Sequence, residues 1–152
     1  MNEWKLPWEG GCRCGAVRIR VTQPPMLTMA CHCAGCQRMS ASAYSLSVAV
    51  PAEGFEVIEG EPVLGGKSRD MHYFCPDCMS WMFTRPPGLD WLVNVRAPVL
   101  DDHLWVAPFV ETFTAEGYGW AKTPAPHSFA TMPEADGWQS LIEAFAAEGP
   151  RP

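Results

Sequence analysis

The segment Cys31–Cys36, with the sequence CHCAGC, places three cysteines within six residues. The other cysteines form two close pairs, Cys12/Cys14 before this segment and Cys75/Cys78 after it. An odd total of seven argues against a disulfide framework, and a Cys-x-Cys pair closes only a strained disulfide. The reducing cytosol, where we place this chain, would also not preserve such bonds. Cysteines clustered in this way indicate metal binding.

The two flanking pairs predict one structural zinc site. Zn²⁺ prefers four tetrahedral ligands, and thiolate sulfur suits it well. Two cysteines that are close in sequence bind one ion at little cost in loop-closure entropy. Two such pairs from distant segments that bind the same ion cross-link those segments. We therefore expect Cys12, Cys14, Cys75 and Cys78 to share one zinc, the alternative being ordinary buried thiols.

The central trio, Cys31, Cys33 and Cys36, provides one ligand fewer than a closed tetrahedron. Three protein ligands and an exchangeable fourth position are typical of a catalytic zinc site. Three alternatives remain open: a closed site, a second metal that is only partly occupied, and a metal-free redox role. A closed site would need a fourth protein ligand, for which the sequence offers His32, His72, His103 and His127. Because His32 lies between two ligands, we expect its ring to point away from their metal.

Composition narrows the class of protein. The chain has 152 residues, of which 47% are hydrophobic and 18% charged, and we expect a single domain over residues 1–152. Its net charge is −6, which disfavours nucleic acid as a partner. No apolar run approaches the roughly 18–20 residues that span a bilayer, and the first residues do not resemble a signal peptide. We therefore expect a cytoplasmic protein without a membrane partner, with the oligomeric state open and a homodimer as one option.

Hydrophobic periodicity predicts many short strands and one terminal helix. An alternation of period two indicates strands, whereas apolar residues at i, i+3, i+4 and i+7 indicate an amphipathic helix. Strands are expected near residues 17–21, 26–30, 44–50, 55–59, 71–74, 81–83, 91–96 and 103–110. A short helix is expected within 34–40, an extended surface tail over 111–133, and a final helix with Asp136 and Gln139 at its start. The apolar face of that helix would comprise Trp138, Leu141, Ile142 and Phe145.

Three motifs together resemble the glutathione-dependent formaldehyde-activating enzymes and their centromere protein V relatives. They are GGCRCGAVR at residues 10–18, CHCAGCQR at 31–38 and FCPDC at 74–78. The likeness covers about residues 8–115, which we expect to form the core, with residues 116–152 as an extended tail and terminal helix. The resemblance implies a mainly β, β-tent fold with short strands, cysteine knuckles and two zinc ions. The first ion maps onto the flanking pairs and the second, functional one onto the trio.

The chain departs from the family pattern at three places. Met79 stands where the family usually has glycine, Arg13 where histidine is common, and the residues before Phe74 lack a frequent arginine. None of these departures removes a metal ligand. They lie near the expected site and therefore bear on which thiol is bound.

The leading hypothesis is zinc-assisted thiol chemistry, a carbon–sulfur lyase activity that joins or releases glutathione and formaldehyde or a related small aldehyde. Cys31, Cys33 and Cys36 would hold the catalytic metal. The carboxylates of the thiol would be contacted by basic or amide side chains, for which the candidates are Gln37, Arg38, Arg13 and Arg69. The alternative is a zinc-stabilised binding module without catalysis, against which the acidity of the chain argues when the partner is chromatin.

Overall fold

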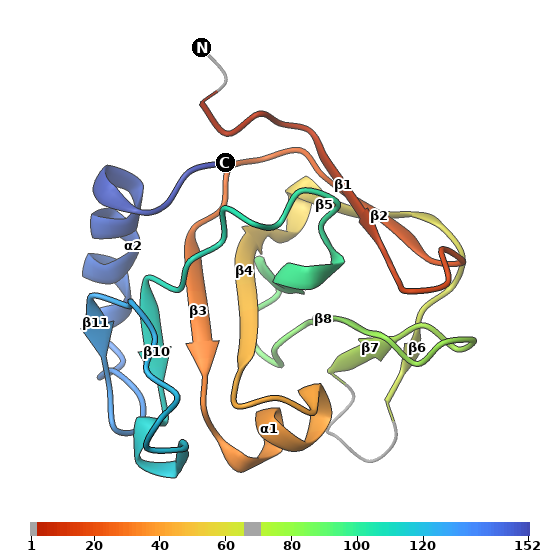
Figure 1. The fold of residues 1–152 in the computed structure, drawn as a ribbon. Helices are drawn as coiled ribbons and strands as arrows, with labels where there is room; N and C mark the ends of the chain where they lie inside the picture. Colours follow the sequence, from red (N-terminus) through yellow and green to blue (C-terminus); the bar gives the residue numbers. More distant parts are fainter. Residues whose placement is uncertain (1–2, 66–70) are drawn as a thin grey trace.

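The computed structural model describes residues 3–65 and 71–152, and its strands form two sheets (Figure 1). The small sheet has the order β1-β2-β5 and the large one the order β11-β10-β3-β4-β9-β8-β7-β6. The strands are β1 (Trp8–Gly11), β2 (Arg18–Val21), β3 (Leu27–Cys31), β4 (Ser45–Pro51), β5 (Phe55–Glu59), β6 (Val63–Leu64), β7 (His72–Phe74), β8 (Trp81–Thr84), β9 (Leu92–Arg96), β10 (Val110–Thr112) and β11 (His127–Ser128). The described part of the chain is therefore mainly β, as the sequence predicted.

One hydrophobic core joins the two sheets. In β2 the apolar residues Ile19 and Val21 are fully buried, and they belong to the same cluster as Val48 and Val95 of the large sheet. The alternating pattern at 17–21 therefore identified the inward face correctly. Burial of these side chains is the main favourable contribution to folding.

The lead-in to the first cysteine pair is a strand, which the sequence did not predict. Gly10 lies in β1 and forms a bridge with Leu100, beside the 3₁₀ helix η2 (Ala97–Val99). A Cβ atom on Gly10 would lie 2.2 Å from the carbonyl oxygen of Val99. Glycine is thus required here for close approach of two backbones rather than for flexibility.

The central strand β4 has buried residues on both of its faces. Its two faces alternate as predicted, yet Ser45 and Ser47 are buried whereas Leu46 is only partly so. β4 pairs with β3 on one side and β9 on the other, and both of its faces are covered. Alternation therefore marks the two faces of a central strand but does not tell which is buried.

The expected strand at 103–110 is wrong in its position. Residues 103–109 are irregular, and the strand is β10, Val110–Thr112, which pairs in parallel with both β3 and β11. Because β10 and β11 extend the large sheet, part of the segment expected to be a surface tail is paired backbone. A strand of three residues is too short for alternation to reveal.

The described residues contain two α-helices. α1 (Ala34–Ser40) confirms the short helix, and α2 (Gly137–Glu148) confirms the terminal one, which packs beside β3 and the β10–β11 edge (Figure 1). Asp136 occupies the N-cap position of α2 but makes no side-chain capping bond, and Gln139 instead donates to Glu143. Two further 3₁₀ turns are η1 (Ala52–Gly54) and η3 (Thr114–Glu116). No helix in the described ranges has the length and apolarity to span a membrane.

Candidate metal centres and the adjoining cavity

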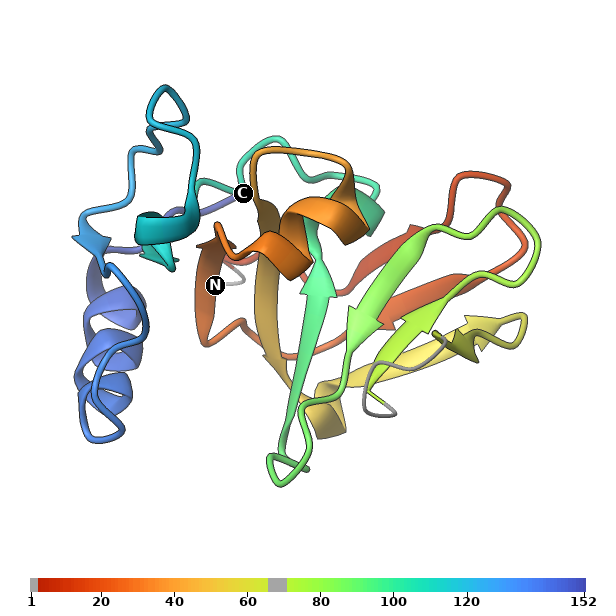
Figure 2. The same cartoon turned by 90° about the horizontal axis from the view of Figure 1, so that it is seen from below.

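The first cysteine cluster joins the tips of two hairpins that are distant in sequence. Cys12 and Cys14 lie in the turn between β1 and β2, and Cys75 and Cys78 in the turn between β7 and β8; Figure 2 shows the two turns side by side. All four sulfur atoms lie within 4.8 Å of one another. The Sγ atoms of Cys12 and Cys14 are 3.6 Å apart and those of Cys14 and Cys75 3.8 Å, too far for disulfide bonds.

These distances fit a tetrahedral zinc ion. With Zn–S bonds of about 2.3 Å, the edges of a tetrahedron measure about 3.8 Å. Backbone amides also turn toward the sulfurs, since the N–H of Val17 donates to Sγ of Cys12 at 3.3 Å. The hydroxyl of Ser80, 3.2 Å from Sγ of Cys78, is the main cause that lowers the pKa of that thiol to about 5. The positions of the four sulfur atoms therefore fit one cation, which would stabilise all four thiolates.

Each knuckle of this cluster ends in a residue with a left-handed backbone. Gly15 has φ of +81° and Met79 has φ of 60°. Glycine adopts this conformation freely, whereas an L side chain is strained there. The departure from the family pattern at Met79 thus carries a physical consequence: the turn keeps the glycine-type backbone without glycine.

The second cluster lies at a single strand–helix junction. Cys31 ends β3, Cys33 is the N-cap of α1, and Cys36 lies in the first turn of α1, where its N–H donates to Sγ of Cys33 at 3.3 Å. The three sulfurs lie within 4.8 Å of one another, and no histidine or carboxylate of the described residues belongs to the group. Three thiols so placed fit a metal ion with one ligand position left for another molecule.

The thiols of Cys31 and Cys36 shift each other's pKa in opposite directions. The hydrogen bond with Cys36 is the main cause that lowers the pKa of Cys31 to about 5, and the same contact together with burial raises the pKa of Cys36. A bound cation would relieve this conflict, since it stabilises all three thiolates together.

His32 turns away from the trio, as its place between two ligands predicted. Its ring is buried and its Nε2 lies 3.2 Å from a carboxylate oxygen of Glu111. Glu111 also accepts hydrogen bonds from Thr123 and, at 2.8 Å, from Ser128. Burial raises the pKa of Glu111, but these three partners outweigh it, so that the pKa is lowered overall. The network ties the loop between Cys31 and Cys33 to the β10–β11 segment.

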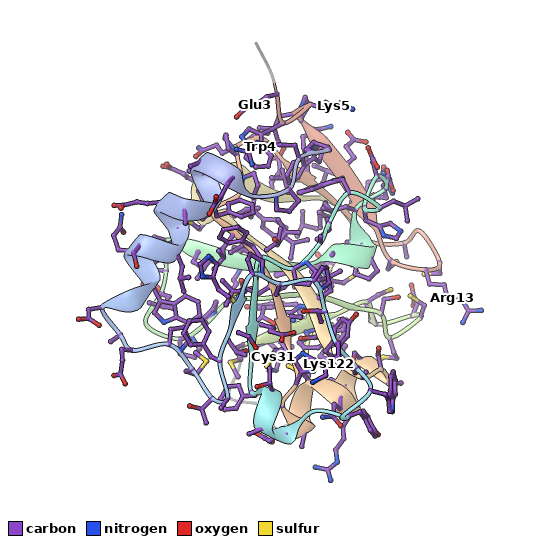
Figure 3. All side chains as sticks on the ribbon, turned by 60° about the vertical axis from the view of Figure 1, so that its left-hand side comes forward. Glu3, Trp4, Lys5, Arg13, Cys31 and Lys122 are labelled. Atoms are coloured by element: carbon purple, nitrogen blue, oxygen red, sulfur yellow. The ribbon has the colours of Figure 1, made fainter. Side chains whose placement is uncertain are left out.

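The residues expected to contact a thiol ligand are divided between two hollows. Arg13 lines a cavity of about 650 Å³, and in Figure 3 its side chain extends outward from the body. Gln37 and Arg38 line another hollow of about 840 Å³, next to the stacked rings of Tyr118 and Trp120. The amide of Gln37 is already committed, because it donates to the carbonyl oxygens of His32 and Glu116 at 2.6 and 2.9 Å. Arg69 lies outside the described residues.

Arg96 is a site residue that sequence reasoning missed. It ends β9, is 9% exposed, and its guanidinium lies 4.0 Å from the ring centroid of Trp81. Its NH2 group donates to Thr84 at 3.0 Å, and Thr84 is also 2.9 Å from Nδ1 of His72. Burial lowers the pKa of Arg96 to about 10, against the opposing effect of Cys36 and Cys31. From the sequence it was only part of the strand expected at 91–96.

The other histidines considered as a fourth ligand have different surroundings. His72 bonds to Thr84 on the neighbouring strand β8, and burial followed by the charge of Arg96 lowers its pKa. His127 packs against Phe109 in the β10–β11 region. His103 belongs to neither cysteine group.

Together, the fold and the two cysteine groups define a mainly β protein with two candidate metal centres. The model of the glutathione-dependent formaldehyde-activating enzyme family matches residues 7–116. Because this match covers more than half of the chain, the protein belongs to that family, as the three motifs predicted.

One curated relative agrees with this assignment, and one solved structure shares the fold. The relative, from Halomonas elongata, bears the name "Putative glutathione-dependent formaldehyde-activating enzyme" and is 30% identical over 105 residues, which are 63% of this chain and 67% of the relative. A crystal structure of a Rhodobacter sphaeroides protein has a TM-score of 0.51 and 20% identity, and covers 62% of this chain and 88% of its own. The latter supports the fold alone. The expected mainly β fold is confirmed, with cysteine groups that could bind zinc and a C-terminal helix.

Proposed function

We propose that the protein is a zinc-dependent enzyme that joins a small thiol to a small aldehyde, or releases them, in the manner of a carbon–sulfur lyase. Glutathione and formaldehyde are the substrates that the family description and the name of the Halomonas elongata relative indicate. The observation that carries the proposal is the contrast between a group of four sulfurs and a group of three. The four would hold a structural zinc, and the three a zinc that accepts the substrate thiol.

The reaction needs a thiolate next to an electrophilic carbonyl carbon. A zinc ion held by Cys31, Cys33 and Cys36 would supply a Lewis acid that keeps an incoming thiol deprotonated at neutral pH. The sulfur lone pair forms the C–S bond while the carbonyl π electrons move to oxygen, which takes a proton and becomes a hydroxyl. The reverse reaction returns thiol and aldehyde.

The chain's own residues orient the three cysteines. β3 fixes Cys31 through its pairing with β4 and β10, and α1 fixes Cys33 and Cys36 through the N-cap contact. Glu111 and His32 hold the intervening loop. Three thiolates with Zn²⁺ sum to a single negative charge, which makes the ion a weaker Lewis acid than one held by neutral ligands and suits it to orienting a thiolate.

The test is exchange NMR on ¹³C-formaldehyde with glutathione. We expect the zinc-loaded protein to accelerate exchange between free formaldehyde and S-(hydroxymethyl)glutathione, and Cys33→Ser to abolish the acceleration. Equal rates with protein, with Cys33→Ser and with buffer alone would refute catalysis and leave a metal-stabilised binding module. Metal analysis of the same samples should give two zinc ions per chain for the native protein and one for the variant.

A further inference from the structure

A cavity of about 650 Å³ lies between the two cysteine groups, and its composition is unusual for this acidic chain. Its size falls within the roughly 300–1,000 Å³ typical of small-molecule sites. It is lined by two arginines, several hydroxyl side chains and a tryptophan, and no aspartate or glutamate of the described residues lines it. The chain as a whole carries a net charge of −6, so this hollow is a local basic site in an acidic protein.

Arg96 forms the buried part of the lining. Its side chain is 9% exposed, and no carboxylate of the described residues forms an ion pair with it. Its Nε atom has no hydrogen-bond partner among those residues. A buried N–H without an acceptor is unfavourable, so this arginine in the cavity lining indicates an acceptor, such as a carboxylate, that comes from outside the chain.

The cavity approaches the second cysteine group from one side. Ser45 lines the cavity, pairs with Cys31 across β3 and β4, and hydrogen-bonds to Cys36. Arg96 lies on β9, the other neighbour of β4, opposite Ser47. A molecule whose sulfur reached the trio could therefore extend past Ser45 to the guanidinium of Arg96.

We propose that this cavity is the subsite for a carboxylate of the thiol substrate, with Arg96 at its base as the residue that selects anionic thiols over neutral ones. This inference rests on the proposed function, because it places the sulfur of the same thiol at Cys31, Cys33 and Cys36. The planar guanidinium, held by stacking on Trp81 and by Thr84, is presented ready to bind a carboxylate. Arg13 stands at the exposed rim and adds charge there.

The experiment compares two thiols of equal chain length, one ending in a carboxylate and the other in a neutral hydroxymethyl group. We would titrate 3-mercaptopropionate and 3-mercapto-1-propanol into the zinc-loaded full chain by calorimetry. The wild type should bind the carboxylate about tenfold more tightly, as a charge-assisted hydrogen bond predicts. Arg96→Gln should reduce this affinity ratio to about one. The control is Arg20→Gln, because Arg20 lies on β2, away from the cavity, and pairs with Glu9; this variant should leave the ratio unchanged. Loss of packing would weaken both thiols alike, so the ratio reports the carboxylate contact specifically.

A wild type that binds the two thiols equally would overturn the subsite. An unchanged affinity ratio in a folded Arg96→Gln variant would also overturn it. A preference lost only in Arg38→Gln would do so too, because it would place the carboxylate in the neighbouring hollow.

A second measurement needs no variant at residue 96. In the ¹⁵N-labelled wild type, the Arg96 Nε–H resonance should shift when 3-mercaptopropionate is added and stay in place with 3-mercapto-1-propanol. The same shift with both thiols, or with neither, would contradict direct contact, and this outcome decides the matter if Arg96→Gln does not fold.

The two proposals fail separately. Catalysed exchange without a carboxylate preference would refute only the subsite. A carboxylate preference without catalysed exchange would refute only the lyase activity.

Discussion

The two cysteine groups use the same ligand atom but are built in opposite ways. The first draws two cysteines from each of two hairpin turns whose members Cys14 and Cys75 are 61 residues apart, and a metal there would cross-link the small and large sheets. The second draws all three cysteines from one strand–helix junction, whose backbone the sheet already positions. We therefore expect the first group to depend on a bound metal to stay assembled, whereas the second is positioned by the fold.

The largest expected difference is in stability. Cys75→Ser should lower the melting temperature by at least about 15 °C, because structural zinc sites contribute about 10–16 kcal/mol of apparent binding free energy, comparable to the whole stability of a domain. Cys33→Ser should lower it by less than about 5 °C, because β3 and α1 stay in place through their backbone pairings. Thermal unfolding followed by circular dichroism, with zinc content measured alongside, makes the comparison. Equal losses from the two variants would show that both groups are structural.

A smaller effect is expected from the support around the second group. Glu111→Gln removes the charge that His32, Thr123 and Ser128 contact. Substitutions that disturb the residues orienting metal ligands typically lower metal affinity 10–100-fold. We expect a loss of about tenfold at the second site only, measured by competition with a chromophoric chelator. Gln139→Glu on the exposed part of α2 is a control for an unrelated polar change, and parallel losses at both sites would refute this selective role.

At the first cysteine group, substitutions in the two turns should change the free energy of unfolding by about 1 kcal/mol. Met79→Gly should stabilise the protein by about 1 kcal/mol, because it relieves the left-handed strain at φ of 60°. Gly15→Ala, at the equivalent position of the other knuckle with φ of +81°, should destabilise by a similar amount. Urea unfolding measures both, and changes of the same sign would contradict the interpretation.

The smallest effect concerns the ion pair that braces the β1–β2 hairpin. Arg18 contacts Asp101 through two hydrogen bonds of 3.0 and 2.6 Å, and these are the main cause that lowers the pKa of Asp101. A lowered pKa means that the contribution is complete at neutral pH and is lost only as the pH falls through the folded-state pKa. Both groups are partly exposed, so Asp101→Asn should cost less than about 1 kcal/mol at pH 7. The difference should shrink in 1 M salt, and a salt-independent loss would indicate a packing role instead.

The sequence predicted the elements with strong local signals. Ile19 and Val21 follow the alternation of a strand, and Leu141 and Phe145 the spacing of a buried helix face, and all four are buried. β10 was misplaced and β11 was missed because two or three residues carry no detectable period. The pairing of β10 depends on β3, about 80 residues earlier, and β11 in turn pairs with β10. For β4 the alternation did not tell which face is buried, because both faces are covered and its serines are buried beside its valines.

By itself, the sequence determined which residues can bind metal, how they divide into four and three, and the family to which the chain belongs. Cysteine spacing is a local property, and ligand chemistry follows from residue type. Only the tertiary structure decided that Arg13 and Arg96, 83 positions apart in the sequence, line one cavity, while Gln37 and Arg38 line another. The physical reason is that the burial and the partners of a charged side chain in a strand depend on the elements that pack around it. From the sequence Arg96 is only one residue of an alternating strand, and it becomes a buried cation stacked on Trp81 only when β9 pairs with β4.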